Sequence, residues 1–288
     1  LKKYLNSKYI LTCNSGTSAI HLAMMAAQIK KGDNIIMPSI NFVASGNIAK
    51  ILNANIFLAD VDPISGHITP SSVMQCIKEN KLRKIKLLVT MYLGGCPNNI
   101  IKFYNLKKKF NFLILEDACH ALGSSYKYKN NFVKIGSCKH SDISVFSLHP
   151  LKSITTGEGG VVSTNNQKIY KRLKLLRSHG IVKSKNLFSH KYNVKFSGLN
   201  NRLSDINCAL GLSQLKKINK FIKKRKILSR QYDQAFKDIK GIQLSHYYPN
   251  KNTSAWHLYI LIINFSYFKT TRINSCTTNC YKTIIFNC

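Results

Sequence analysis

The stretch SDISVFSLHPLKSITTGEGGVVSTN, residues 141–165, decides the fold. Its short apolar run from Ile143 to Phe146 is typical of a buried strand. Ser147 and Lys152 follow this run, and a glycine-rich turn comes next at residues 157–160. In parallel α/β sheets, ligands bind beyond the carboxyl ends of the strands. The stretch therefore predicts a strand that leads into a candidate ligand-binding loop.

Other short apolar runs precede this stretch, at residues 34–37, 56–59, 86–90 and 112–115. Longer segments that suit helices separate them, such as residues 98–109. Strands that alternate with helices imply a mostly parallel sheet with helices on both faces. We therefore expect an α/β fold.

Helical patterns occur at three further places. The run Asn14-Ser15-Gly16-Thr17 suits a helix start, and apolar residues recur at helical spacing from Ala19 to Ile29. A second pattern covers residues 167–177, and a long one covers residues 204–237 and leads into a second domain. Residues 266–288 are rich in Thr, Asn and Cys and have no clear period.

Three features have the residue types that a pyridoxal 5'-phosphate (PLP) site requires. Gly16 and Thr17 open a helix, whose free amides suit a phosphate. Asp117 ends the run at residues 112–115 and suits a protonated pyridine nitrogen, and Lys152 suits the Schiff base and proton transfer. Each feature alone has a simpler explanation, as a helix cap, a strand-end carboxylate or a surface lysine. The interpretation depends on their combination.

The composition narrows the class of protein. The 288 residues carry a formal net charge of +33, from 44 Lys plus Arg against 11 Asp plus Glu. The lysines are spread along the chain, so compositional drift explains the charge better than a polyanion-binding surface, and nucleic acid is an unlikely partner. No apolar run has the length of a membrane span, so we expect a soluble cytoplasmic protein. The nine cysteines contain no C-x-x-C pair, so we expect reduced thiols and no metal site.

Several motifs, taken in order, resemble the DegT/DnrJ/EryC1/StrS family of sugar aminotransferases. The resemblance is continuous from about residue 8 to residue 264. Its main motifs are CNSGTSAIHLA at 13–23, IMPSINFVASGNIAK at 36–50, LEDACHALGSSY at 115–126, the stretch at 141–165, and GLNNRLSDINCALGLSQL at 198–215. Within the family, EDACHALG and SLHPLKSITTGEGG are most similar to the branch that serves pseudaminic acid biosynthesis.

The resemblance implies the fold type I architecture of PLP-dependent transferases, which is aspartate aminotransferase-like, and usually a homodimer with shared active sites. Lys152 matches the Schiff-base lysine, and Asp117 matches the partner of the pyridine nitrogen. The other matching positions are Gly16, Thr17 and Ser147 near the phosphate, Phe42 stacked on the ring, His120 beside the cofactor, Asn200 reaching the partner subunit's cofactor, and His149 near the substrate.

The implied reaction moves an amino group from L-glutamate to C4 of a UDP-linked 4-keto-6-deoxy-N-acetylhexosamine. Lys152 is then the acid and base of both half-reactions. Sugar dehydratases of the family have His at this position, so the lysine favours transamination.

The chain also departs from the family pattern. Asn201 stands where the family usually has Tyr, the segment that commonly precedes the first helix is missing, and the pattern fades after Asn264. We therefore expect a PLP-binding large domain at residues 1–200, the start of a truncated small domain at 201–265 and an off-pattern tail at 266–288. Two alternatives remain open: an inactive truncated or frameshifted fragment, and a basic polyanion-binding protein on the same fold.

Overall fold

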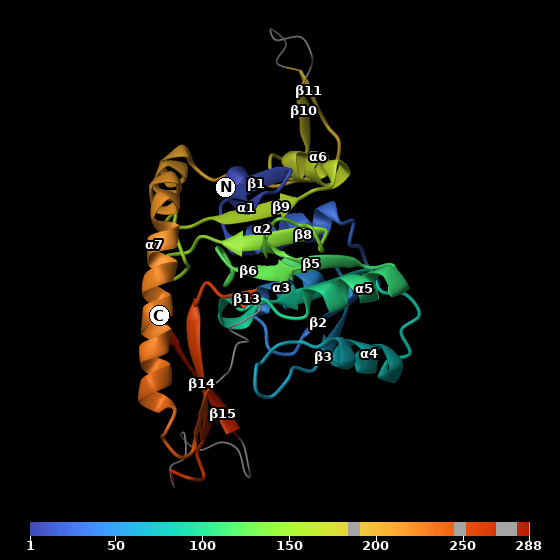
Figure 1. Ribbon diagram of the computed structural model, residues 1–288. Helices are drawn as coiled ribbons and strands as arrows, with labels where there is room; N and C mark the ends of the chain where they lie inside the picture. Colours follow the sequence, from blue (N-terminus) through green and yellow to red (C-terminus); the bar gives the residue numbers. More distant parts are fainter. Residues whose placement is uncertain (184–190, 245–251, 269–280, 288) are drawn as a thin grey trace.

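The computed structural model describes residues 1–183, 191–244, 252–268 and 281–287. Within these residues, seven strands form the central sheet in the order β1-β9-β8-β5-β4-β2-β3 (Figure 1). The strands of this sheet are β1 (Tyr9–Cys13), β2 (Asn34–Pro38), β3 (Asn55–Ala59), β4 (Leu87–Met91), β5 (Leu113–Asp117), β8 (Ile143–Ser147) and β9 (Gly160–Thr164). β9 runs antiparallel to both of its neighbours, while the pairings from β8 to β3 are parallel.

Helices cover both faces of this sheet. The helices are α1 (Lys2–Leu5), α2 (Gly16–Ala26), α3 (Val43–Ile51), α4 (Pro70–Glu79), the 3₁₀ turn η1 (Leu93–Gly95), α5 (Ile100–Phe110), α6 (Gln167–Leu176) and α7 (Asp205–Phe236). Side chains of α2, α3 and α6 share one core cluster with Leu87 and Val89 of β4, whereas α4 and α5 share another with Leu88. Because successive strand residues point to opposite faces, β4 is buried on both sides.

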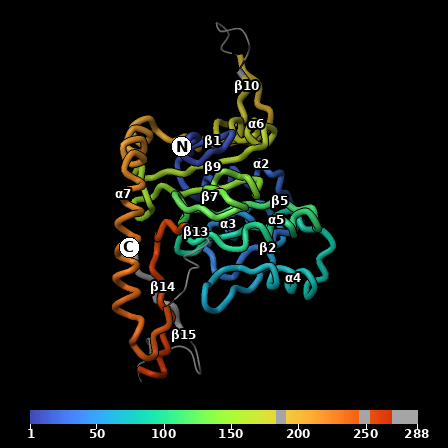
Figure 2. Tube along the Cα trace, viewed as in Figure 1, coloured from blue at the N-terminus to red at the C-terminus, as the bar shows by residue number. Residues whose placement is uncertain are grey.

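Three smaller sheets flank the central one. They contain β6 (Ser125–Tyr128), β7 (Asn131–Lys134) and β13 (Asn252–Thr253); the pair β10 (Ile181–Lys183) and β11 (Tyr192–Val194); and β12 (Ile242–Leu244), β14 (Leu258–Asn264) and β15 (Tyr281–Asn287). The long helix α7 runs along one side of the molecule, from the central sheet to β14 (Figure 2). Its Ile218 packs in a core cluster with Phe146 of β8, and its Asp233 accepts a 2.7 Å hydrogen bond from the Tyr259 hydroxyl of β14.

The structure confirms the mostly parallel α/β sheet that the sequence predicts. The five predicted strands correspond to β2, β3, β4, β5 and β8, and the predicted helices to α2, α5, α6 and α7. The sequence did not predict β1 or β9. Gly160 was assigned to a turn but begins β9, where an added Cβ would lie 2.0 Å from the Ser15 carbonyl oxygen. Close backbone packing therefore explains this glycine.

The last part of the chain contains a strand that the sequence pattern does not indicate. β15 pairs antiparallel with β14 over its whole length, within residues 266–288. The proposed domain boundaries at residues 200 and 265 stay predictions. Among the described residues, none of the helices combines the length and the apolar character required to cross a bilayer.

Candidate active site

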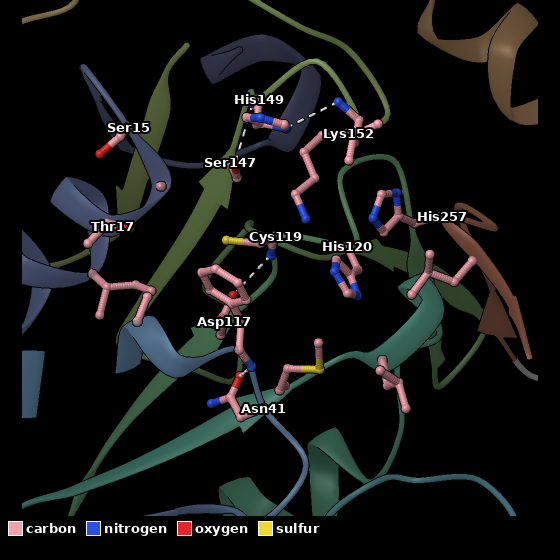
Figure 3. Close-up of a pocket in the computed structure, with 18 of the residues that line it drawn as sticks. Ser15, Thr17, Asn41, Asp117, Cys119, His120, Ser147, His149, Lys152 and His257 are labelled. Carbon is pink, nitrogen blue, oxygen red and sulfur yellow. Dashed lines mark hydrogen bonds between the residues drawn. The ribbon is translucent and has the colours of Figure 1, made fainter. Parts of the chain in front are cut away.

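A cavity of about 590 Å³ lies at the carboxyl edge of the central sheet. β5 ends at Asp117 and β8 ends at Ser147, and these parallel neighbours place both residues at the same edge. The cavity brings together eight of the nine predicted site residues, which are Gly16, Thr17, Phe42, Asp117, His120, Ser147, His149 and Lys152. Figure 3 shows how most of them surround one space.

The start of α2 forms one end of the cavity. Ser15 is the N-cap, and its Oγ accepts a 3.0 Å hydrogen bond from the Ser18 amide. An added Cβ on Gly16 would lie 2.8 Å from the Ser147 Cβ, so these two residues are in close contact. The amides of the first helical turn carry partial positive charge and need acceptors. This end of the cavity is therefore suited to an anion.

Asp117 forms the floor of the cavity and is only 4% exposed. Its Oδ1 accepts a 3.2 Å hydrogen bond from the Cys119 amide, and its Oδ2 accepts a 3.5 Å bond from the Ser45 Oγ. Burial raises the pKa of this carboxyl group, while the thiol and amide of Cys119 and the charge of Lys152 act in the opposite direction. The site therefore holds a buried acid with dedicated donors.

Lys152 projects into the cavity from the loop after β8 (Figure 3). The loop is pinned by backbone hydrogen bonds from Lys152 to the His149 carbonyl (2.9 Å) and from Thr156 to the Leu148 carbonyl (3.0 Å). Burial lowers the pKa of the Lys152 amine, and the nearby Cys119 and Asp117 oppose this effect. A partly desolvated amine on a fixed loop can act as a nucleophile and as a base.

Two histidines face each other across the side of the cavity next to Lys152. The ring centroids of His120 and His257 lie 4.3 Å apart. Burial lowers the pKa of His120 to about 2 and that of His257 to about 3; repulsion by neighbouring positive charge adds to both shifts. Within the described part of the chain, the Nδ1 atoms of both rings are buried without a hydrogen-bond partner. The pair therefore places two neutral rings at this side of the cavity.

His149 and Phe42 lie at more exposed positions of the cavity. His149 Nε2 is 3.7 Å from Glu158 Oε1, and both side chains are well exposed. Phe42 precedes α3 as its N-cap and is 67% exposed. Such a ring is available to cover a flat ligand.

Asn200 is the one predicted residue that the structure does not bring to this cavity. It is exposed and forms an isolated bridge with Ser178. The neighbouring Asn201 is buried, and its carbonyl oxygen accepts a 3.1 Å hydrogen bond from the Asn14 amide. Asn201, which stands where the family usually has Tyr, therefore contacts the segment just before α2.

Asn41, Cys119 and His257 line the cavity but were not predicted from the sequence. Asn41 directly precedes the predicted Phe42, and Cys119 stands between Asp117 and His120, so proximity in sequence was a usable signal for both. His257 had no such signal, because a hydrogen bond from its amide to the Gly94 carbonyl (2.8 Å) brings it in from a distant segment. Among the described residues, no group of three or more His, Cys, Asp or Glu side chains is arranged to hold a metal ion.

The sheet order and the strand-end site define an α/β transferase fold of the PLP-dependent type. The sequence profile of the DegT/DnrJ/EryC1/StrS aminotransferase family matches residues 1–280, and the chain belongs to this family. This range extends beyond residues 8–264, over which the individual motifs are recognisable.

Two similar proteins have names that describe an aminotransferase or transaminase. The UDP-4-amino-4,6-dideoxy-N-acetyl-beta-L-altrosamine transaminase of Campylobacter jejuni is 37% identical over 268 residues, which are 91% of this chain and 66% of that protein. The structure of Helicobacter pylori PseC, described as an aminotransferase involved in the biosynthesis of pseudoaminic acid, has a TM-score of 0.82 and 33% identity. The match covers 94% of this chain and 70% of PseC. The chain thus spans slightly less than two thirds of the Campylobacter relative.

The fold is also similar to that of a putative sugar aminotransferase, Spr1654 of Streptococcus pneumoniae, in its PLP form. The TM-score is 0.80 at 24% identity, with 91% of this chain and 68% of that chain covered. At this identity the likeness concerns the fold alone.

Proposed function

We propose that this protein is a PLP-dependent nucleotide-sugar aminotransferase. In this reaction an amino group passes from L-glutamate to C4 of a UDP-linked 4-keto-6-deoxy-N-acetylhexosamine, for a surface glycan of the pseudaminic acid type. The main support for the proposal is that Lys152, Asp117 and the start of α2 line the same cavity. The names of the Campylobacter and Helicobacter relatives support the choice of sugar.

The residues at the anion-binding end fit the phosphate of PLP. Gly16 leaves room that a Cβ would fill, since that atom would lie 2.8 Å from Ser147. The amides at the start of α2 would donate to phosphate oxygens, and the hydroxyls of Thr17 and Ser147 also line this end. The phosphate would thus be anchored by groups that are already in place.

The floor of the cavity fits the pyridine ring. The Asp117 carboxylate would pair with the protonated ring nitrogen, and Phe42 would cover the ring. PLP, when bound, supplies an electron-withdrawing ring that stabilises the negative charge left when a proton leaves the amino-bearing carbon. The role of Asp117 is to keep that ring protonated by remaining ionised.

Lys152 has two tasks in the proposed reaction. Its amine holds the cofactor covalently in the resting enzyme, and burial favours the neutral form that this requires. With a substrate bound, the free Nζ would take the proton from the amino-bearing carbon of the substrate and return it to the cofactor carbon on the other side of the nitrogen between them. Acid and base functions then fall to the same Nζ in both half-reactions.

The surroundings of the cavity support an anionic substrate and a homodimer. The net charge of +33 attracts a nucleotide diphosphate. Large apolar side chains near the cavity mouth are exposed, including Phe42, Leu151 and Ile206, the last 84% exposed. Asn207 at the start of α7 donates a 3.2 Å hydrogen bond to the carbonyl of Glu158, which lines the cavity. A second copy of this chain would cover these side chains, and Asn200 would then reach the partner's cofactor.

We place the reaction in the cytoplasm. The described cysteines, which are Cys13, Cys76, Cys96, Cys119, Cys138 and Cys208, are all free thiols. Free thiols are typical of proteins in a reducing compartment.

The test is an absorption titration of the purified protein with PLP, followed by addition of L-glutamate. We expect a visible band that grows with PLP and bleaches with glutamate. Lys152→Ala should lack the band, whereas the control Lys171→Ala, at an exposed position of α6, should retain it. Folded wild-type protein without a band would contradict the proposal and favour the inactive-fragment alternative.

A basic and aromatic cluster on the outside of the molecule favours polyanion binding as a second candidate function. The ammonium groups of Lys108 and Lys139 lie over the rings of Tyr104 and Tyr128, at 4.7 Å and 5.0 Å from the centroids. None of these residues lines the active-site cavity. Single-stranded nucleic acid binds to such combinations with strong salt dependence. Equal binding by wild type and a Lys108→Glu, Lys139→Glu double variant would refute this second function.

A further inference from the structure

Three segments that are far apart in the sequence meet at one buried serine. Ser124 belongs to the turn after β5 and is fully buried. Its Oγ donates a 2.6 Å hydrogen bond to the Gly95 carbonyl of η1 and accepts a 2.8 Å bond from the Ala255 amide, which precedes β14. Because one hydroxyl can donate and accept at the same time, it bridges η1 to the segment before β14.

Each of the three segments carries a residue that lines the active-site cavity. Leu93 begins η1, His120 lies in the same turn as Ser124, and His257 belongs to the segment before β14. Figure 3 shows His120 and His257 beside Lys152. The hydroxyl thus joins the backbone segments that form this side of the cavity.

The backbones are in close contact at this junction. Gly95 has a φ of +92°, in the left-handed region that favours glycine. An added Cβ there would lie 2.4 Å from the His120 carbonyl oxygen and 3.4 Å from the His257 amide nitrogen. A displacement of one segment would therefore be passed directly to the others.

Other hydrogen bonds hold the incoming segment on both sides of Ala255. β13 pairs with β6 before it, and after it the His257 amide donates a 2.8 Å hydrogen bond to the Gly94 carbonyl. These bonds do not involve the Ser124 hydroxyl. Loss of that hydroxyl should therefore displace the segment locally and leave the fold intact.

The loss would leave two buried backbone groups poorly satisfied. The Ala255 amide would keep only a 3.4 Å contact with the Gly95 carbonyl, near the outer limit of a hydrogen bond. The Gly95 carbonyl would lose the donor at 2.6 Å. Buried polar groups without a good partner are costly, so the segment should move or open to water.

We propose that Ser124 is a positioning residue for the substrate side of the active site. Its hydroxyl sets the spacing between η1 and the segment before β14, and it thereby holds His257 and Leu258 in the cavity next to Lys152. This inference rests on the proposed function, in which the ends of β5 and β8 and the start of α2 anchor the cofactor. A substrate that reaches Lys152 would then contact the side that Ser124 positions.

The proposal predicts a split between substrate binding and cofactor binding. The proposed cofactor anchors are Asp117, Lys152 and the start of α2, and none of them is a hydrogen-bond partner of the Ser124 Oγ within the described part of the chain. Removal of the hydroxyl should weaken the binding of a substrate and leave the affinity for PLP nearly unchanged. A general loosening of the fold would weaken both.

The first measurement is amide hydrogen exchange of residues 252–258 in the full-length protein with PLP. We expect Ser124→Ala to exchange about tenfold faster than wild type in this segment. Ser124→Thr keeps the hydroxyl and should stay within about threefold of wild type. The control Ser7→Ala removes another buried hydroxyl, which donates a 3.2 Å hydrogen bond to the Tyr9 carbonyl, and should match wild type.

The second measurement is the rate at which increasing L-glutamate bleaches the cofactor band of the same four proteins. For Ser124→Ala we expect the half-saturating glutamate concentration to rise by about tenfold. Its limiting rate and its dissociation constant for PLP should stay within about threefold of wild type. Ser124→Thr should restore glutamate saturation, and Ser7→Ala should leave it unchanged.

The outcomes separate the two levels of the argument. If glutamate does not bleach the wild-type band, the proposed function falls, and the role of Ser124 toward substrate falls with it. If wild type is bleached and Ser124→Ala has the half-saturating concentration of wild type, the positioning role alone is refuted. Parallel losses in glutamate saturation, limiting rate and PLP affinity would also refute it. So would equal effects of Ser124→Ala and Ser124→Thr, because the hydroxyl would then not be responsible.

Discussion

Two walls of the active-site cavity differ in their chemistry. The sheet wall consists of the ends of β5 and β8 and the start of α2, and it presents Asp117, Lys152 and the amides of α2. The β14 wall consists of η1 and the start of β14, and it presents Leu93, His257 and Leu258. The first wall carries charge and free donors, whereas the second is apolar apart from a neutral histidine. Charge is thus concentrated where the sheet edge fixes the backbone.

The comparison of the two walls shows how the buried charge of Asp117 is maintained. Asp117 belongs to a strand that has neighbours on both sides, the adjoining turn supplies the Cys119 amide as a donor, and α3 supplies the Ser45 hydroxyl. His257 is also buried, yet burial drives it to the neutral form. The two walls therefore call for different tests, since removal of a charge should affect the reaction most and removal of a neutral ring should affect acid stability.

The largest effect that sharpens this contrast should come from Asp117→Asn. The amide has nearly the same shape but carries no charge, so it cannot keep the cofactor's ring nitrogen protonated. We expect the rate of amino transfer from glutamate to fall by on the order of a hundred- to a thousandfold, as for loss of one preorganised electrostatic partner. Stopped-flow bleaching of the cofactor band measures this rate.

Asp60→Asn is the matched control for this substitution. Asp60 is exposed after β3 and does not line the cavity. If the rate of amino transfer by Asp117→Asn is within a few-fold of the rate of this control, the charge of Asp117 is not required for the reaction.

A smaller effect should come from Gly16→Ala, which tests the phosphate end of the same wall. The new methyl group would lie 2.8 Å from the Ser147 Cβ, so α2 or β8 must shift. Overpacking of this kind costs about 1–3 kcal/mol, and we expect PLP affinity to fall by about tenfold or more. Equilibrium titration with PLP measures the change.

Gly46→Ala is a strict control, because nothing lies within 4 Å of an added Cβ there and the site is inside α3. It should bind PLP as wild type does, with unchanged or slightly higher stability. If both alanine variants bind PLP equally well, Gly16 does not line a phosphate site.

The two walls were not equally predictable from the sequence. Asp117, Ser147 and Lys152 follow apolar runs directly, and the rule that parallel strands present their carboxyl ends at one edge is enough to bring them together. The nine predicted roles of the site residues remain predictions, but eight of these residues share the cavity. The residues of the sheet wall could therefore mostly be predicted from their order along the chain.

The β14 wall depends on tertiary contacts that no local pattern shows. His257 reaches the cavity because its amide bonds to Gly94 and because the Ala255 amide bonds to the Ser124 Oγ, at 2.8 Å in both cases. Ser124 belongs to the turn after β5, and its Oγ also donates to the Gly95 carbonyl. A small buried hydroxyl thus joins three distant segments. Nothing in the residues around His257 distinguishes it from an ordinary core histidine.

The last effect concerns the β14 wall and the dependence of stability on pH. The pKa of His257 is lowered from its usual 6.5 to about 3 by burial, so the unfolded chain takes up a proton that the folded chain does not. The stability that the neutral ring contributes is complete above the unfolded pKa and is lost as the pH falls below it. Between about pH 6 and pH 4, this one histidine should remove about 1.4 kcal/mol per pH unit from the free energy of unfolding.

His257→Phe separates this titration from packing. The phenyl ring can still stack on His120, which lies 4.3 Å away in the native pair, but it has no proton to bind. Urea denaturation at pH 7 gives the packing change, and the same measurement at lower pH gives the titration. As the pH falls, we expect the free energy of unfolding to decrease less steeply for the variant than for wild type. The difference between the two slopes should correspond to the uptake of about one proton. Parallel slopes would mean that His257 is protonated in the folded protein, and the β14 wall would then carry charge as the sheet wall does.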